Sequence, residues 1–228
     1  MIEFSLALGV FLLAHMVPTA PAIRARLTHA LGRRTYLVLY SAVSLALLAW
    51  VVVAAGRAPY IPLWDPLPWQ WWAALLVMPF ALVLLVAGLA TANPLSVSLR
   101  KTLPGSRPAG ITAVTRHPVL WGFGLWAVAH IPPNGDVVSL ILFGGMALLA
   151  FGGMAIVDRK ARRRLGPSWG DMAGEAPVLP LATPASRGAI LRLDKAAVLT
   201  TLTALAFFVW FIFDGHLRLI GLDPLAGL

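Results

Sequence analysis

Cysteine is absent from this chain of 228 residues, and acidic residues are scarce, with nine Asp and Glu against 18 Lys and Arg. Without cysteine there are no disulfides, no thiolate metal ligands and no cysteine nucleophiles. No acidic residue lies deep in a long apolar run, which argues against a relay of carboxylates that carries protons through a membrane. The five histidines form no His-x-x-x-His pair, and no carboxylate cluster accompanies them. A zinc protease site therefore lacks support.

Long apolar runs dominate what is present. Hydrophobic residues make up 59% of the chain and charged residues 12%, and the mean hydropathy is +0.82, far from an ordinary soluble domain. Each run is near the ~20 residues that a bilayer core requires. The sequence predicts an all-α protein, a polytopic transmembrane helix bundle that forms a single transmembrane domain over residues 1–228. About six spans are expected, at residues 4–23, 35–55, 69–90, 113–131, 137–157 and 196–213.

The basic residues predict how the spans are oriented. Sixteen of the 18 Lys and Arg fall in the first, third and fifth connections, and only Arg57 and Arg218 fall on the other side. Because cytoplasmic loops are enriched in Lys and Arg, both termini are expected outside. The charge lies in short connections between apolar runs, so we expect contact with anionic lipid headgroups and no binding of nucleic acid.

Glycines in two of the runs allow close approach of a neighbour. Gly122 and Gly124 lie in the fourth run, and Gly145 and Gly152 lie seven residues apart in the fifth. The neighbour is either another helix or a flat cofactor, and the sequence leaves both interpretations open.

Histidines within or beside the apolar runs are the candidate functional residues. His15 and His117 are predicted near the cytoplasmic face, and His130 and His216 near the outer face. His117 and His130 are 13 residues apart, which on one helix is roughly 20 Å along the axis and about 140° around it. The simplest pairs are therefore His15 with His117 and His130 with His216. Imidazole suits haem iron, and a helix bundle can hold a porphyrin. The alternative for each ring is a hydrogen bond between helices.

Four ordered blocks of sequence resemble the NnrU family of bacterial membrane proteins. They are AHMVP around His15, ANPLS at 92–96, VTRHPVLWGFGLWAVAH at 114–130, and DGHLRLIGLDP at 214–224. The resemblance covers nearly the whole chain and implies a place in the bacterial inner membrane. It also implies a link to denitrification and nitric oxide metabolism.

A relative of that family, the 15-cis-ζ-carotene isomerase, implies more specific chemistry. The resemblance implies haem b as cofactor and isomerisation of a cis-carotenoid or another lipophilic small molecule, with a redox partner to reduce the iron. Its two haem ligands fall on His15 and His130 of this chain, whereas the depth estimate leaves His117 as a further iron ligand. Ala127 stands where the isomerase has a cysteine, so ligand exchange by a thiolate is absent.

Two other classes remain open. Arg116, His117 and Pro118, with Asp158 and the LGPSW segment at 165–169, resemble isoprenylcysteine carboxyl methyltransferases. That resemblance implies S-adenosylmethionine as cofactor, with Arg116 on its carboxylate and His117 in contact with it. Where those enzymes carry paired glutamates and tyrosines, this chain has Asp158 followed by a basic residue, and Trp169. The third class is a non-catalytic membrane subunit or haem carrier.

Overall fold

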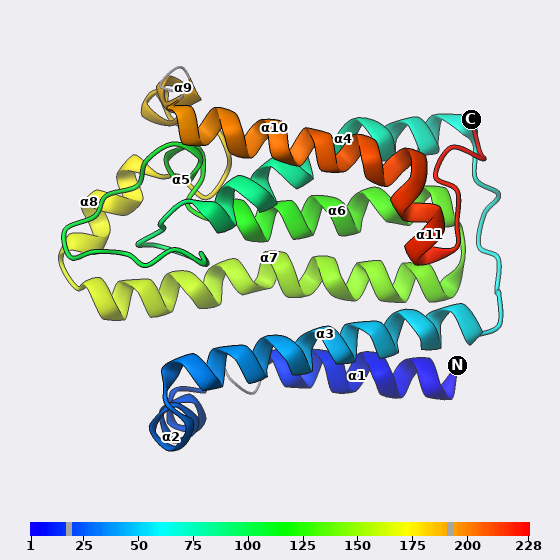
Figure 1. Cartoon of the computed structure of the whole chain (residues 1–228), viewed down its shortest axis with the longest axis horizontal. Helices are drawn as coiled ribbons and strands as arrows, with labels where there is room; N and C mark the ends of the chain where they lie inside the picture. The colour runs from blue at the N-terminus through cyan, green and yellow to red at the C-terminus, as the bar shows by residue number, and fades with distance from the viewer. Residues whose placement is uncertain (17–19, 191–193) are drawn as a thin grey trace. The chain divides into compact units, whose positions relative to one another are not determined.

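The computed structural model describes residues 1–16, 20–190 and 194–228, and this part of the chain is built from helices (Figure 1). Within it, the strand-like pairing consists of one isolated bridge between Pro62 and Asp136. In chain order the helices are α1 (Ile2–Met16), α2 (Pro21–Leu31), α3 (Arg33–Arg57), α4 (Pro68–Ala90), α5 (Ile111–Val114), α6 (Pro118–Asn134), α7 (Val137–Leu165), α8 (Ser168–Glu175), α9 (Pro184–Ile190), α10 (Lys195–Trp210), the π-helical turn η2 (Phe211–Gly215) and α11 (His216–Ile220).

Four helices are long and apolar enough to cross a membrane: α3, α4, α7 and the continuous stretch Lys195–Ile220 formed by α10, η2 and α11. They contain the spans predicted at 35–55, 69–90, 137–157 and 196–213, and they confirm the predicted class, an all-α membrane bundle. α1 and α6 are also apolar but shorter, with 15 and 17 residues. The span predicted at 4–23 falls partly on residues 17–19, outside the described residues.

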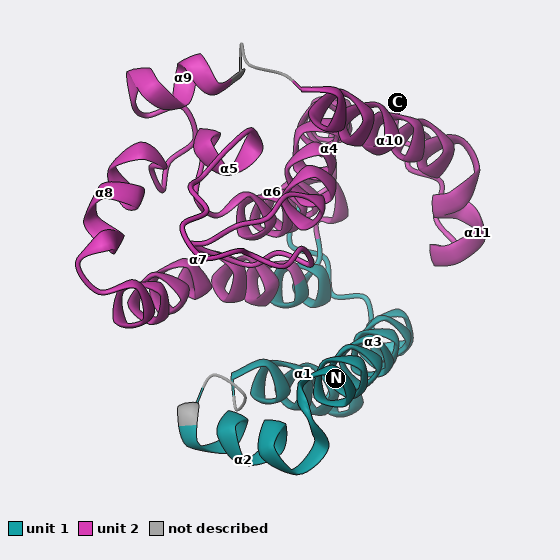
Figure 2. Cartoon of the chain, turned by 60° about the vertical axis from the view of Figure 1, so that its left-hand side comes forward, with its two compact units in different colours: residues 1–64, 136–142 teal, residues 65–135, 143–228 magenta. Residues whose placement is uncertain are grey.

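The described chain forms two compact units, which Figure 2 shows in different colours. Unit 1 comprises residues 1–64 and 136–142, and unit 2 comprises residues 65–135 and 143–228. The prediction of a single transmembrane domain stays a prediction. In unit 1, α1 packs on α3 and buries Phe4 and Phe11, while Val51 is buried on α3.

In unit 2, α6 packs closely against its neighbours through glycines. A Cβ atom added at Gly122 would lie 2.7 Å from the carbonyl oxygen of Ala81 on α4, so only glycine allows this approach of the two backbones. A Cβ atom at Gly124 would overlap the ring of Phe151 on α7. The neighbour that these two glycines admit is therefore another helix and not a flat cofactor.

The stretch predicted as one span at 113–131 is interrupted. α5 ends at Val114 and α6 begins at Pro118, so Arg116 and His117 lie in a connection between two helices. Pro118 suits the first position of a helix because it lacks an N–H that would need a partner there. It also disfavours the helical conformation at the preceding residue, and His117 has φ −121° and ψ 50°. The break places a charged and a polar side chain outside the helices.

Candidate functional site

Arg116 and Asp158 form a largely buried ion pair at one end of unit 2. Nε of Arg116 donates to both carboxylate oxygens at 3.0 and 3.1 Å, and Nη2 donates to Oδ2 at 2.6 Å. Nη1 donates to the carbonyl oxygen of Ala176 at 3.1 Å, and the backbone N–H donates to Pro177 at 3.0 Å. The two side chains are only 12% and 19% exposed. The pair therefore ties the connection before α6 to α7 and to the segment after α8.

His117 lies fully buried beside this pair. Its Nδ1 is 2.8 Å from the hydroxyl of Ser96, and its Nε2 is 3.0 Å from Oδ1 of Asp158 without the alignment of a hydrogen bond. Burial lowers the pKa of His117 to about 4, Asp158 opposes that shift, and Arg116 adds to it. The imidazole is thus neutral at pH 7. Asn93 completes the surroundings by donating to the carbonyl oxygen of Arg116 at 3.0 Å.

His130 lies on α6, three turns beyond His117, and has different neighbours. Its Nδ1 bonds the carbonyl oxygen of Trp126 at 2.7 Å. Its ring lies 5.3 Å from the ring of Trp126 and 4.9 Å from that of Phe143, measured between centroids. A carbonyl oxygen only accepts, so Nδ1 carries the proton and Nε2 carries the lone pair.

His216 follows the π-helical turn η2, and the sequence analysis did not anticipate this turn. Its Nδ1 bonds the carbonyl oxygen of Leu222 at 2.7 Å, which places the lone pair on Nε2 again. Insertions of π geometry recur at functional sites in helices. The pairing of His130 with His216, suggested by depth along the helices, stays a prediction.

His15 has the same local geometry in unit 1. Its Nδ1 bonds the carbonyl oxygen of Phe11 at 2.8 Å, and its ring lies 4.2 Å from Phe11 and 5.9 Å from Tyr40. His15 and His117 belong to different units, so their pairing stays a prediction. The same holds for His15 with His130.

The donor set fits a haem better than a bare metal ion. In the three described ranges of the chain, no three His, Asp or Glu side chains come together as a cluster that could hold a metal ion. A porphyrin supplies four nitrogen ligands itself and needs only axial imidazoles. In His15, His130 and His216 a backbone carbonyl oxygen accepts from Nδ1–H and orients the ring, so Nε2 is the nitrogen that could bind iron. His117 is less suited, because polar neighbours face both of its ring nitrogens.

Some residues around Arg116 and His117 were not identified from the sequence as positioning groups. Ser96 contacts the ring of His117, and Asn93 donates to the backbone carbonyl of Arg116. Both residues lie in the ANPLS block at 92–96, which the sequence marked only as part of the family resemblance. Asp158 was noted, but as part of a methyltransferase pattern and not as the partner of Arg116. Asn93 is 23 positions from Arg116 and Asp158 is 42 positions from it, so a pattern of neighbouring residues cannot predict these contacts.

The long apolar helices and their packing define a polytopic helical membrane protein. A family model described as NnrU protein matches residues 3–224. The chain therefore belongs to the NnrU family. No curated protein and no solved structure shows significant similarity to it.

Proposed function

We propose that this protein is a haem-binding membrane protein of the NnrU type, with His130 as an axial ligand of haem b. The observation that carries the proposal is the neutral His130 ring, whose Nδ1–H is held by Trp126 while Nε2 keeps its lone pair. His130 also belongs to two of the three histidine pairs that the sequence suggests, His130 with His216 and His130 with His15. Depth along the helices favours His216 as the second ligand, whereas the resemblance implies His15.

The residues around His130 have distinct tasks in this proposal. The carbonyl of Trp126 fixes the ring orientation and raises the basicity of Nε2. The rings of Trp126 and Phe143 surround the imidazole with apolar surface and keep water from it. Bound haem would supply an iron that can change its oxidation state and bind a small ligand when one of the protein ligands is released.

The resemblance extends the proposal to a reaction. It implies a haem-dependent isomerase that acts on a cis-carotenoid or another lipophilic molecule when the iron is reduced by a redox partner. It also implies a link to nitric oxide or denitrification metabolism and a place in the bacterial inner membrane. The distribution of Lys and Arg between the connections places both termini outside in this proposal. The alternative, a non-catalytic haem carrier, would bind haem in the same way as the isomerase but would catalyse no reaction.

The methyltransferase class is supported less well by the geometry. It requires the guanidinium of Arg116 to hold the carboxylate of S-adenosylmethionine. Nε and Nη2 of Arg116 instead bind Asp158, and Nη1 binds Ala176. A cofactor carboxylate would have to displace a charge-assisted, bidentate interaction.

The test is the absorption spectrum of protein purified after expression with a supply of haem precursor. The oxidised protein should show a Soret band that shifts on reduction with dithionite, and a haem b pyridine complex should give the stoichiometry. His130→Ala should lose most of the haem, whereas His29→Ala, a change of an exposed histidine on α2, should keep it. Colourless wild-type protein, or a His130→Ala spectrum equal to the wild type, would refute the proposal.

The second ligand and the substrate need separate measurements. A six-coordinate iron that becomes five-coordinate in His216→Ala but not in His15→Ala identifies His216, and the reverse identifies His15. Adding a cis-carotenoid or nitric oxide to the reduced protein then tests for isomerisation or for ligand binding. A red protein that does neither is a haem carrier.

A further inference from the structure

Unit 2 contains an apolar cavity of about 800 Å³ that haem ligation by the histidines does not involve. Its walls are α4, α6 and α10, closed at one end by α5 and the segment before α9. Along α10 it extends from Ala197 to Leu205, which at the rise of a helix is about 12 Å. The volume falls within the range of small-molecule sites.

The lining offers hydrocarbon contacts almost exclusively. Its polar side chains are Thr201 and Trp121, and the indole N–H of Trp121 already donates to the carbonyl oxygen of Val178 at 2.8 Å. α4 and α6 approach each other closely at Gly122, and Trp121 and Leu125 on α6 line the cavity beside this contact. A void of this size forfeits dispersion contacts along its whole wall unless an apolar molecule fills it.

Backbone strain marks the rim of the cavity. Leu181 lines the rim with φ 63°, and it is the one residue other than glycine with positive φ in the described ranges. Its N–H donates to Val114 at 3.2 Å, and its carbonyl oxygen accepts from Nε of Arg187 at 2.9 Å. Strained conformations of this kind persist where the surroundings enforce them and often occur at ligand clamps. The same hydrogen bond fixes the exposed guanidinium of Arg187 beside the rim.

We infer that this cavity binds an anionic amphiphile, with one hydrocarbon chain inside and a carboxylate or phosphate headgroup on Arg187. The terminal nitrogens of a guanidinium present a planar set of donors that suits either anion. A free fatty acid and a membrane phospholipid share this chemistry. The inference is independent of haem and concerns a different part of unit 2 from His130 and His216.

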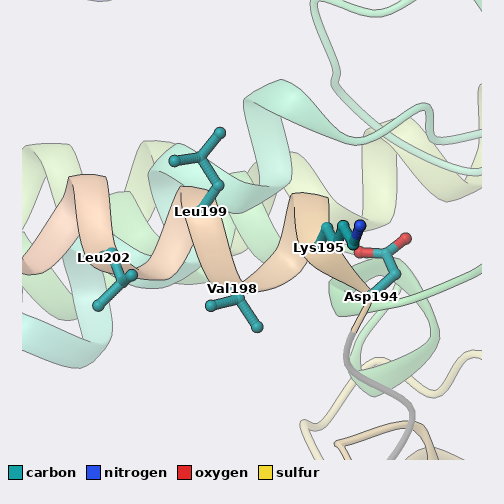
Figure 3. A pocket seen from close by; sticks show the side chains of 5 residues that line it. All are labelled: Asp194, Lys195, Val198, Leu199 and Leu202. Atoms are coloured by element: carbon teal, nitrogen blue, oxygen red, sulfur yellow. The ribbon is translucent and has the colours of Figure 1, made fainter.

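A second groove on α10 provides the matched control. It is shallow and lies along Asp194, Lys195, Val198, Leu199 and Leu202 (Figure 3). Figure 3 shows Leu199 pointing to one side of the helix and Val198 and Leu202 to the other, so these side chains do not enclose a chain. Leu202 is 59% exposed and neighbours Thr201 in sequence, but only Thr201 lines the cavity.

The experiment is photolabelling in phosphatidylcholine nanodiscs with a long-chain fatty acid that carries a diazirine in mid-chain. Labelled peptides are mapped by mass spectrometry. We expect label on the cavity faces of α4 and α10, and about a tenfold loss in Thr201→Trp, because roughly 1.4 kcal/mol of binding changes occupancy tenfold. Leu202→Trp should label as the wild type does. Thr201→Leu, a smaller change, should give an intermediate loss if the tryptophan variant does not fold.

The headgroup is tested with the methyl ester of the same probe. Arg187→Gln should weaken labelling by the acid several-fold and leave labelling by the ester unchanged, whereas Arg163→Gln on α7 should alter neither. Competition by oleate identifies a free fatty acid as the ligand, and competition by phosphatidylglycerol identifies a lipid. Equal labelling of Thr201→Trp and Leu202→Trp, or equal loss of acid and ester in Arg187→Gln, overturns the inference. His130→Ala should label normally, which separates this result from that of haem binding.

Discussion

The two ends of unit 2 both hold histidine, yet they surround it differently. At one end, His117 is enclosed by Ser96, Arg116 and Asp158, and its neutral ring is part of a closed polar network. At the other end, aromatic rings surround His130, and backbone carbonyls hold Nδ1–H of His130 and His216. The first arrangement uses imidazole to build the fold, whereas the second leaves a lone pair for a ligand.

The largest expected effect is on the haem content of the protein, which should differ between substitutions at the two ends of unit 2. His130→Ala should remove most of the Soret absorbance, because an axial ligand is lost. His117→Asn should keep it, because both nitrogens of that ring face polar neighbours. The measurement is absorbance per mole of folded protein. If His117→Asn also bleaches the protein, the difference between the ends does not hold.

The next effect concerns the ion pair beside His117. Arg116→Ala should lower the free energy of unfolding by about 3 to 5 kcal/mol, because it leaves the carboxylate of Asp158 buried without its partner. Chemical unfolding in detergent measures the change. Arg163→Ala, at an exposed position on α7, should change stability by less than about 0.5 kcal/mol. The double variant Arg116→Leu with Asp158→Leu should recover part of the loss, and no recovery would show that the residual charge is not the cause.

A smaller effect should appear with pH. The pKa of His117 is about 4 in the folded protein and about 6.5 when unfolded, so the neutral ring stabilises the fold fully above pH 6.5. This contribution, roughly 3 kcal/mol from the shift of the pKa, should be lost as the pH falls from 6.5 towards 4. Unfolding of wild type and His117→Asn across that window measures it. Parallel pH profiles would contradict the burial of a neutral imidazole.

The smallest effect is expected at the end of unit 2 that holds His216, where Arg218 pairs with Asp214 at 2.5 Å, one turn away on the helix surface. Arg218 is 74% exposed, so Arg218→Ala should cost only about 0.3 to 0.5 kcal/mol, and salt should reduce that further. Thermal unfolding at low and high salt provides the comparison with Arg116. If Arg218→Ala lost nearly as much stability as Arg116→Ala, solvent exposure would not explain the difference expected between the two ion pairs.

The helices themselves could be predicted well from sequence. Long apolar runs gave the positions of α3, α4, α7 and α10, because hydropathy is a sum over neighbours in the chain. The prediction was less exact where local chemistry interrupts a run, as at the break before Pro118. Signals for that break were present in the Arg-His-Pro order, since proline restricts the residue before it.

The sequence by itself determined that the chain is a helical membrane protein of the NnrU family and which histidines lie in or beside apolar helices. Tertiary structure alone decided that Arg116 binds Asp158, that Ser96 contacts the ring of His117, and that a cavity lies beside α10. The physical reason is range. Hydropathy, helix breaks and the bond from a histidine ring to a carbonyl oxygen four residues earlier depend on residues close in the chain. An ion pair and a cavity depend on which distant surfaces meet.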